Sequence, residues 1–353
     1  MQLREQLTKL TTTAGISGNE QAISQCLKEF YQPYCDEIVY DNLGSLYAVK
    51  HAKTADAPRV LVNAHMDELG FIVKKINPNG TLWALALGQA QPAALLGQKI
   101  IVTTRQKQHF PGVILGQDQA QTALNKQNEI LVDIGFKDEQ EAKAAGIFLG
   151  DMVTFGSSLF AANSGHYLYA PNWNGRLSVS QTIDILRAVA GLTLDFELYV
   201  GCTVQEHVGL RGAQTATNLV APDLTIALDT QAAFDYQSDA KDCQGILGQG
   251  LLLTYYDTTV LPNRLLLNTF KQICQQTQTA YQYYYSLSGS DSGWINKLRT
   301  GCPTLLVGQA VRNLDAGLQV AAVDDYQAVI QGVLEFIKQL TPAEIQAFKQ
   351  ENR

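Results

Sequence analysis

The stretch RVLVNAHMDELGFIVKKI, residues 59–76, decides the fold. It begins as a continuous apolar run, which is typical of a strand that is buried on both faces of a sheet. The run breaks into a polar cluster that contains His65 and Asp67. Beyond it, up to about Gly165, short β-rich runs are separated by turn signals such as NPNG at residues 77–80. We therefore predict that an inserted domain begins at about residue 69.

On both sides of this insertion, strand patterns alternate with helix patterns. After residue 166 the sequence predicts helices over residues 174–191, 264–276 and 324–340, strands over residues 195–204, 223–229 and 302–308, and a last helix from Thr341. Such alternation is typical of an α/β sheet that helices cover on both faces. The predicted fold is α/β, a mixed sheet flanked by helices over residues 1–68 and 166–353, with a small inserted β-barrel-like domain over residues 69–165.

Two helix starts carry the signal of a capping box, in which a Ser or Thr side chain and a Glu three residues later satisfy each other's backbone. One is Ser17 with Glu20, and the other is Thr341 with Glu344. We predict that each begins a helix, the second with Pro342 in its first turn.

Composition excludes several classes of protein. Of 353 residues, 46% are hydrophobic and 17% charged, which is typical of a globular chain. The net charge of −7 argues against a nucleic-acid or anionic-membrane surface. The first ten residues, MQLREQLTKL, lack the apolar core of a signal peptide, and the six cysteines show no Cys-x-x-Cys spacing. These features predict a cytoplasmic protein with reduced thiols.

Polar residues follow three predicted strands where each strand ends: His65 and Asp67, then Glu206 and His207, then Asp229. In open α/β sheets, ligands bind at this edge. A histidine oriented by a nearby carboxylate is a common metal ligand, and Glu206 is placed to take a proton from a metal-bound water. Each signal alone also fits an ordinary polar loop or a turn. Their combination favours a metal site, and we interpret His51, His109 and His166 as structural.

Five segments resemble one family in their order along the chain. AGISGNE, AHMDELGF, VQEHVGLRGA, PDLTIALD and GSDSG are similar to segments of the glutamyl and deblocking aminopeptidases, self-compartmentalising tetrahedral enzymes whose relatives are often labelled endoglucanases. The resemblance implies the metallo-exopeptidase fold and a two-metal enzyme, with zinc or cobalt, that removes N-terminal residues from short peptides. It also implies self-association, from a dimer made through the inserted domain up to a dodecameric cage.

The resemblance assigns roles to four residues whose types match the family. His65 corresponds to a histidine of the first metal, and Asp229 to the carboxylate of that metal. Asp67 corresponds to the carboxylate that orients the site, and Glu206 to the general base. Ser290 and Asp291, which follow a tyrosine-rich run at residues 281–286, are candidates for substrate binding.

Three further positions depart from the family pattern. Asn174 stands where the resemblance expects a bridging aspartate, His207 where it expects a glutamate, and Asp315 where it expects a histidine. His207 and Asp315 keep one imidazole and one carboxylate with their positions exchanged, and both are ordinary zinc ligands. Simple drift at both positions is the alternative. Asn174 offers one good acceptor oxygen, so we expect weak or single-metal occupancy.

Three functions remain open from the sequence. The first is a metal-dependent aminopeptidase with a rearranged metal site, in which His65, Asp229 and Asn174 hold one metal and His207 and Asp315 hold another. The second is a non-catalytic relative, either a cage subunit or a peptide binder, that has lost two-metal binding. The third is a hydrolase of other amides or acyl groups on the same scaffold.

Overall fold

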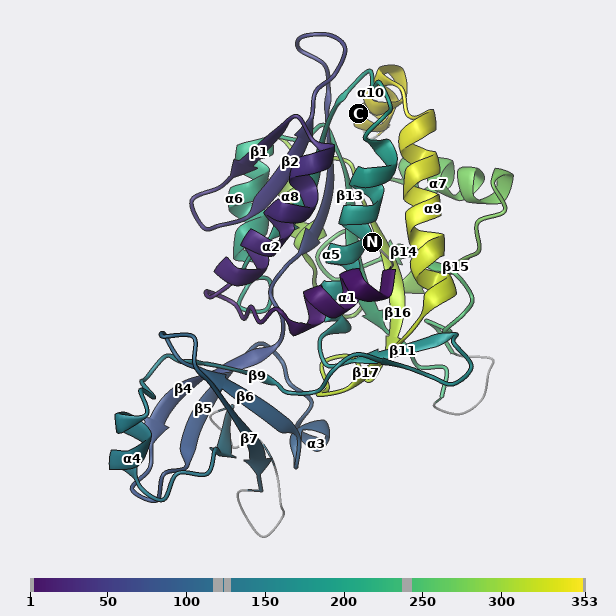
Figure 1. Cartoon of the computed structure of the whole chain (residues 1–353). Coiled ribbons are helices and arrows are strands. Elements are labelled where there is room, and N and C mark those ends of the chain that lie inside the picture. The colour runs from purple at the N-terminus through teal and green to yellow at the C-terminus, as the bar shows by residue number, and fades with distance from the viewer. Residues whose placement is uncertain (1–2, 117–122, 124–127, 237–242, 352–353) are drawn as a thin grey trace.

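The computed structural model describes residues 3–116, 123, 128–236 and 243–351. Figure 1 shows two bodies, a sheet covered by helices and, at the lower left, a smaller barrel. Within the described residues, no helix is long and apolar enough to cross a lipid bilayer. The predicted fold class, a mixed α/β sheet flanked by helices with an inserted barrel, is confirmed.

Eleven strands of the described residues form the large sheet. They are β1 (Glu37–Tyr40), β2 (Leu46–Lys50), β3 (Arg59–His65), β10 (Phe160–Ala161), β11 (Tyr167–Ala170), β12 (Glu197–Thr203), β13 (Leu224–Ala232), β14 (Leu251–Tyr256), β15 (Tyr281–Tyr285), β16 (Thr304–Arg312) and β17 (Gln319–Ala322). The main path runs β1-β2-β12-β3-β13-β16-β17-β11-β10, and β14 and β15 branch from β16. Strands β12, β3, β13 and β16 pair in parallel, so their carboxyl ends meet at one edge.

Helices cover both faces of this sheet. They are α1 (Leu3–Thr12), α2 (Gln21–Tyr31), the short 3-10 helix η1 (Gln32–Tyr34), α5 (Trp173–Val189), α6 (Arg211–Val220), α7 (Arg264–Gln276), α8 (Asp291–Lys297), α9 (Val323–Gln339) and α10 (Pro342–Gln350). Alternation along β3 explains why both faces are covered. Val60 and Val62 pack into the core made with α2, α5 and α9, whereas Leu61 packs against α6 and α8 on the other face.

The insertion forms a closed barrel in the order β4-β5-β8-β7-β6-β9. Its elements are β4 (Gly70–Ile76), β5 (Leu82–Leu87), α3 (Pro92–Leu95), β6 (Lys99–Thr103), β7 (His109–Leu115), β8 (Glu129–Asp133), α4 (Glu139–Ala144) and β9 (Met152–Phe155). A separate apolar core fills it, which includes Phe71, Ile100 and Val132. The barrel strands lie within the predicted limits of 69–165, although β10 within those limits pairs with β11 in the large sheet.

The two predicted capping boxes have different outcomes. At Thr341 the prediction is confirmed, because the Thr341 hydroxyl accepts from the Glu344 backbone and the Glu344 side chain accepts in return. At Ser17 it is wrong. Helix α2 begins at Gln21 with Glu20 at the N-cap and no side-chain cap, and the Ser17 hydroxyl donates to Asp67 instead. A buried carboxylate from a distant segment has replaced the local partner.

Candidate metal and peptidase site

The residues predicted for the site converge at the carboxyl edge of the parallel strands. His65 ends β3 opposite Thr203 at the end of β12, and Asp229 lies on β13 opposite Gly308 of β16. Loops that follow these strands bring Glu206, His207 and Asp315 to the same place. Asn174 reaches it from the start of α5. One cavity of about 390 Å³ is lined by Asn174, Glu206, His207, Asp229 and Asp315, together with other residues.

Asp67 is fully buried and supports the loop that follows β12. Its two oxygens accept the backbone N–H groups of Glu206, at 3.0 Å, and of His207, at 3.1 Å, and the Ser17 hydroxyl, at 2.5 Å. Burial alone raises the pKa of a carboxyl, but hydrogen bonding and the charges of His65 and His207 hold the pKa of Asp67 well below its usual value. Asp67 is therefore an anionic anchor for three segments, and its role in orienting the site stays a prediction.

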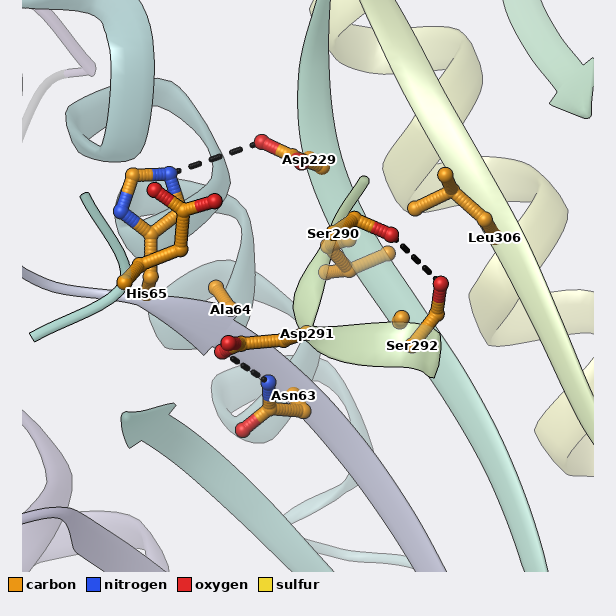
Figure 2. A pocket seen from close by; sticks show the side chains of 11 residues that line it. Asn63, Ala64, His65, Asp229, Ser290, Asp291, Ser292 and Leu306 are labelled. Carbon is orange, nitrogen blue, oxygen red and sulfur yellow. Dashed lines mark hydrogen bonds and ion pairs between the residues drawn. The ribbon is translucent and has the colours of Figure 1, made fainter. Parts of the chain in front are cut away.

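His65 lies between carboxylates, with its imidazole 3% exposed. Its Nε2 is 3.5 Å from Oδ1 of Asp229 (Figure 2), and its Nδ1 is 3.6 Å from Oδ1 of Asp67. Burial opposes a charge on this ring, but Glu206, Asp229 and Asp67 together raise the pKa of His65 well above its usual value. The ring thus occupies a site that favours positive charge, whether a proton or a cation.

Asn174 presents its two amide ends to different neighbours. Its Oδ1 accepts from Nε2 of His65 at 3.0 Å and from the Thr230 hydroxyl at 3.2 Å. Its Nδ2 donates to Oδ1 of Asp315 at 2.7 Å. The carboxylate of Asp315 fixes this orientation, because a flipped amide would turn its oxygen toward another acceptor. Asn174 therefore offers a ligand oxygen toward His65 and a donor toward Asp315.

A break in the backbone of α5 makes this placement possible. Asn174 and Gly175 have non-helical dihedral angles, and Gly175 has φ of +84°. A side chain at Gly175 would lie 2.7 Å from the carbonyl oxygen of Asp67 and 3.1 Å from Cε1 of His65. Glycine is therefore required both for the dihedral angle and for the close approach of the imidazole.

Glu206 and His207 face the cavity from a loop that begins at Gln205, whose φ is +56°. The rings of His65 and His207 meet edge to face with centroids 5.4 Å apart. Burial raises the pKa of Glu206 well above its usual value and lowers that of His207. A carboxyl with a raised pKa suits a general base that works near neutral pH.

Asp315 lies on a turn in which Asn313 and Asp315 both have positive φ, +54° and +63°. Asn and Asp tolerate this left-handed conformation better than other non-glycine residues. Burial raises the pKa of Asp315.

A buried ion pair beneath the site was missed by the sequence reasoning. Glu68 and Arg176 are 2% and 0% exposed, and Oε1 of Glu68 lies 2.9 Å from Nη2 of Arg176. The guanidinium also donates to the carbonyl oxygens of Leu10, Met66 and Thr13. The signal was present in the sequence, because both residues directly follow site residues, Glu68 after Asp67 and Arg176 after Asn174 and Gly175.

Ser290 and Asp291 lie behind the site. They line a cavity of only about 10 Å³, shown in Figure 2, together with His65, Glu206 and Asp229. That space admits about one water molecule. Oδ2 of Asp291 accepts from Thr203 and Asn63, and burial raises the pKa of Asp291 to about 6. Their predicted contact with substrate stays a prediction.

The other three histidines lie elsewhere. His51 pairs with Glu197, His109 contacts Thr103 in the barrel, and His166 is exposed.

A family model described as the M42 glutamyl aminopeptidase matches residues 44–331. The chain belongs to this family. The predicted resemblance is thus confirmed, and the family's members are metal-dependent hydrolases of peptides. Among its relatives, the glutamyl aminopeptidase of Lactococcus lactis subsp. cremoris (strain MG1363) is 28% identical over 362 residues, covering 99% of this chain and 100% of the relative.

Two solved structures have a similar fold. The TET aminopeptidase from the marine sediment archaeon Thaumarchaeota archaeon SCGC AB-539-E09 has a TM-score of 0.92 at 30% identity, covering 98% of both chains. The TET1 peptidase of Pyrococcus horikoshii, which can assemble into a tetrahedron or a large octahedral shell, has a TM-score of 0.85 at 22% identity. That match covers 96% of this chain and 100% of the other.

The residues present fit a divalent ion. Two ligands bound tetrahedrally to one zinc ion, at about 2.0–2.2 Å, lie roughly 3.3–3.6 Å apart. Oδ1 of Asp229 lies 3.5 Å from Nε2 of His65, within that range. One ligand atom each from His65, Glu206 and His207 also lies within 4.8 Å of the others. Nδ1 of His65 and Nε2 of His207 are buried and have no hydrogen-bond partner among the described residues.

Proposed function

We propose that this protein is a metal-dependent aminopeptidase that removes N-terminal residues from short peptides with a rearranged metal site. One observation carries the proposal. Nε2 of His65 lies 3.5 Å from Oδ1 of Asp229, a separation suited to two ligands of one cation, and 3.0 Å from Oδ1 of Asn174, beside the carboxylate of Glu206. Membership of the M42 aminopeptidase family supports the reaction class.

His65, Asp229 and Asn174 would hold the ion, for which zinc or cobalt is expected from the resemblance. The bound ion would polarise the scissile carbonyl and lower the pKa of a water molecule. Glu206 would take the proton of that water and pass it to the leaving amine, a role that its raised pKa favours. Asp67 would hold Glu206 and His207 in place through their backbone N–H groups.

A second ion at His207 and Asp315 is less well supported. The amide nitrogen of Asn174 donates to Asp315 at 2.7 Å, so a donor faces the position where a bridging oxygen would be needed. We therefore infer that one equivalent of metal binds tightly. In this form of the proposal, His207 and Asp315 contact the substrate side of the site and do not complete a second tight metal centre.

The runner-up function is a non-catalytic cage subunit or peptide binder. Asn174 favours it, because its amide nitrogen donates to Asp315 and only its single oxygen can serve as a ligand toward His65. Self-association is proposed for either function, since structural relatives include a peptidase that forms tetrahedral and octahedral shells. A cytoplasmic location stays a prediction from the sequence.

The deciding experiment measures metal per subunit by elemental analysis, before and after incubation with zinc or cobalt, with aminopeptidase assays on the same samples. We expect one tightly bound equivalent and activity that rises in proportion to it. Two tight equivalents would overturn the single-ion form of the proposal. No uptake of metal, and no cleavage of any peptide, would establish the non-catalytic function. Metal uptake with hydrolysis of other amides or esters only would favour a different hydrolase.

A further inference from the structure

A second cavity opens directly from the proposed catalytic site. Its volume is also about 390 Å³, which lies in the usual range for ligand sites, about 300–1,000 Å³. The two cavities share four wall residues, which are Gln231, Leu287, Ser288 and Leu314. They are therefore adjoining compartments, and a ligand held in one can extend into the other.

The two compartments differ in charge. The catalytic compartment is lined by three carboxylates, Glu206, Asp229 and Asp315. Among the described residues, the second compartment has no charged side chain in its wall, which includes the rings of Phe234, Tyr284 and Tyr285. The phenol of Tyr284 is already engaged, because it donates to the carbonyl oxygen of Ala232 at 3.0 Å.

The remaining polar groups of the second compartment are neutral. Gln244 is bound to the edge of β15, donating to the carbonyl oxygen of Tyr285 and accepting from its backbone N–H, each at 3.2 Å. Ser286 and Ser288 hydrogen-bond to each other. A charged ligand group placed here would lose water without gaining an ion-pair partner among the described wall residues, which is unfavourable.

We propose that the second compartment receives the side chain of the peptide's N-terminal residue and selects an uncharged, apolar or aromatic one. Asp315 in the adjoining compartment then faces the α-ammonium group of the same residue. A free N-terminal residue with a neutral side chain matches both compartments at once. Glutamyl and lysyl N-termini match only the catalytic one. The inference rests on the proposed function and deepens it by naming the substrate class.

The test uses the full chain loaded with zinc or cobalt and tetrapeptides X-Ala-Ala-Ala, where X is Leu, Phe, Glu or Lys. We expect kcat/KM for Leu and Phe to exceed that for Glu and Lys by at least about tenfold, because the described residues of the pocket wall offer no counter-charge. Cleavage with equal or higher kcat/KM for Glu or Lys would overturn this inference and leave the proposed aminopeptidase function intact.

Leu287 offers a charge-insertion variant with a matched control. Its side chain is 76% exposed and lines both compartments, whereas Leu261 is 70% exposed and lines a different cavity with Asn263 and Lys349. We expect Leu287→Arg to raise kcat/KM for Glu relative to Leu by at least about tenfold, through the added cation. Leu261→Arg should leave this ratio unchanged. An unchanged ratio in Leu287→Arg would contradict the placement of the side-chain pocket.

A binding measurement separates failure of the pocket from failure of catalysis. L-leucine, L-phenylalanine, L-glutamate and L-lysine are titrated into the protein by calorimetry. If no peptide is cleaved but the two neutral amino acids bind at least about tenfold more tightly, the pocket stands and the proposed function fails. If neither cleavage nor a preference in binding is found, both proposals fail.

Discussion

The two halves of the site are built differently. In the strand half, which is His65, Asp67 and Asp229, His65 ends β3, Asp229 lies within β13, and Asp67 is buried against the backbone of the loop that follows β12. In the loop half, which is His207 and Asp315, the side chains stand on loops that contain residues with positive φ, such as Gln205 in the first loop and Asp315 itself in the second. Asn174 joins the halves, with its oxygen toward His65 and its nitrogen toward Asp315.

This difference indicates which positions of the site tolerate substitution. A residue at a strand end is positioned by its sheet neighbours and by buried partners, so replacing it disturbs the core. A residue on a loop is less constrained by regular sheet neighbours, although the side chain of His207 is only 8% exposed. Both of the predicted exchanges, at His207 and at Asp315, fall in the loop half, and the strand half has the residue types that the resemblance expects.

Glu206 carries the largest predicted effect, because it serves the reaction whichever half binds metal. Glu206→Gln keeps the size of the side chain and removes the base, so we expect kcat to fall by about 10²–10⁴-fold. Elemental analysis should find the metal content unchanged. Glu197→Gln, at the opposite end of β12, is the matched control and should keep full activity. Loss of metal together with activity in Glu206→Gln would instead make Glu206 a ligand.

Arg176 tests the support of the strand half. Arg176→Met leaves Glu68 charged and buried without its ion-pair partner, which costs about 3–5 kcal/mol of unfolding free energy. Urea unfolding measures the loss. Arg187→Met is the control, because that guanidinium is 35% exposed beside Asp184, and such a pair contributes about 0–1 kcal/mol. Similar losses of unfolding free energy in both variants would mean that the buried pair of Arg176 and Glu68 stabilises the strand half no more than an exposed pair does.

Asn174→Asp removes the chemical difference between the two halves of the site, in which Asn174 presents an oxygen to His65 but a nitrogen to Asp315. The new carboxylate can give one oxygen to each side, so we expect a second equivalent of zinc, bound roughly ten- to a hundredfold more tightly than in the parent protein. Without metal, the variant should melt at a lower temperature, because Asp315 lies beside the added charge. Titration calorimetry and melting with and without zinc measure both effects.

Asn313→Asp supplies the control for added charge. Asn313 is exposed, is two residues from Asp315 and already has the positive φ that Asp tolerates. It should not change the metal stoichiometry. A single equivalent in Asn174→Asp would mean that the loop half cannot hold an ion even with a bridging carboxylate.

The sequence predicted the fold class and the gathering of most site residues at one edge of the sheet. Both predictions follow from simple periodic patterns of apolar residues. The apolar run that ends at His65 specifies a strand buried on two faces, and the helix predicted over residues 264–276 is α7 (Arg264–Gln276) in the structure. The contacts made beyond the strand ends were harder to predict. Neither the orientation of the Asn174 amide nor the pairing of Glu68 with Arg176 is a local property, since each partner comes from a distant segment.

Ser17 and Thr341 show the limit of local signals, because each precedes a glutamate by three residues. Thr341 is exposed and bonds to Glu344 of its own helix, so its capping box forms. Ser17 lies against the buried Asp67, and a hydrogen bond to a buried carboxylate is stronger than one to a backbone N–H group. Glu20, the expected capping partner of Ser17, also bonds to a distant segment. Its side chain accepts the backbone N–H of Gln205 in the loop that carries Glu206.

The smallest predicted effects separate these two roles. Thr341→Ala should lower the free energy of unfolding by about 1 kcal/mol, because an N-cap is lost, with metal affinity unchanged. Ser17→Ala should instead weaken metal binding by roughly tenfold, because Asp67 loses one of the donors that fix the strand half. Zinc titration and urea unfolding of both variants give the comparison. If Ser17→Ala lowered stability alone and left zinc affinity intact, Asp67 would be held well enough by Glu206 and His207, and the strand half would not depend on the segment before α2.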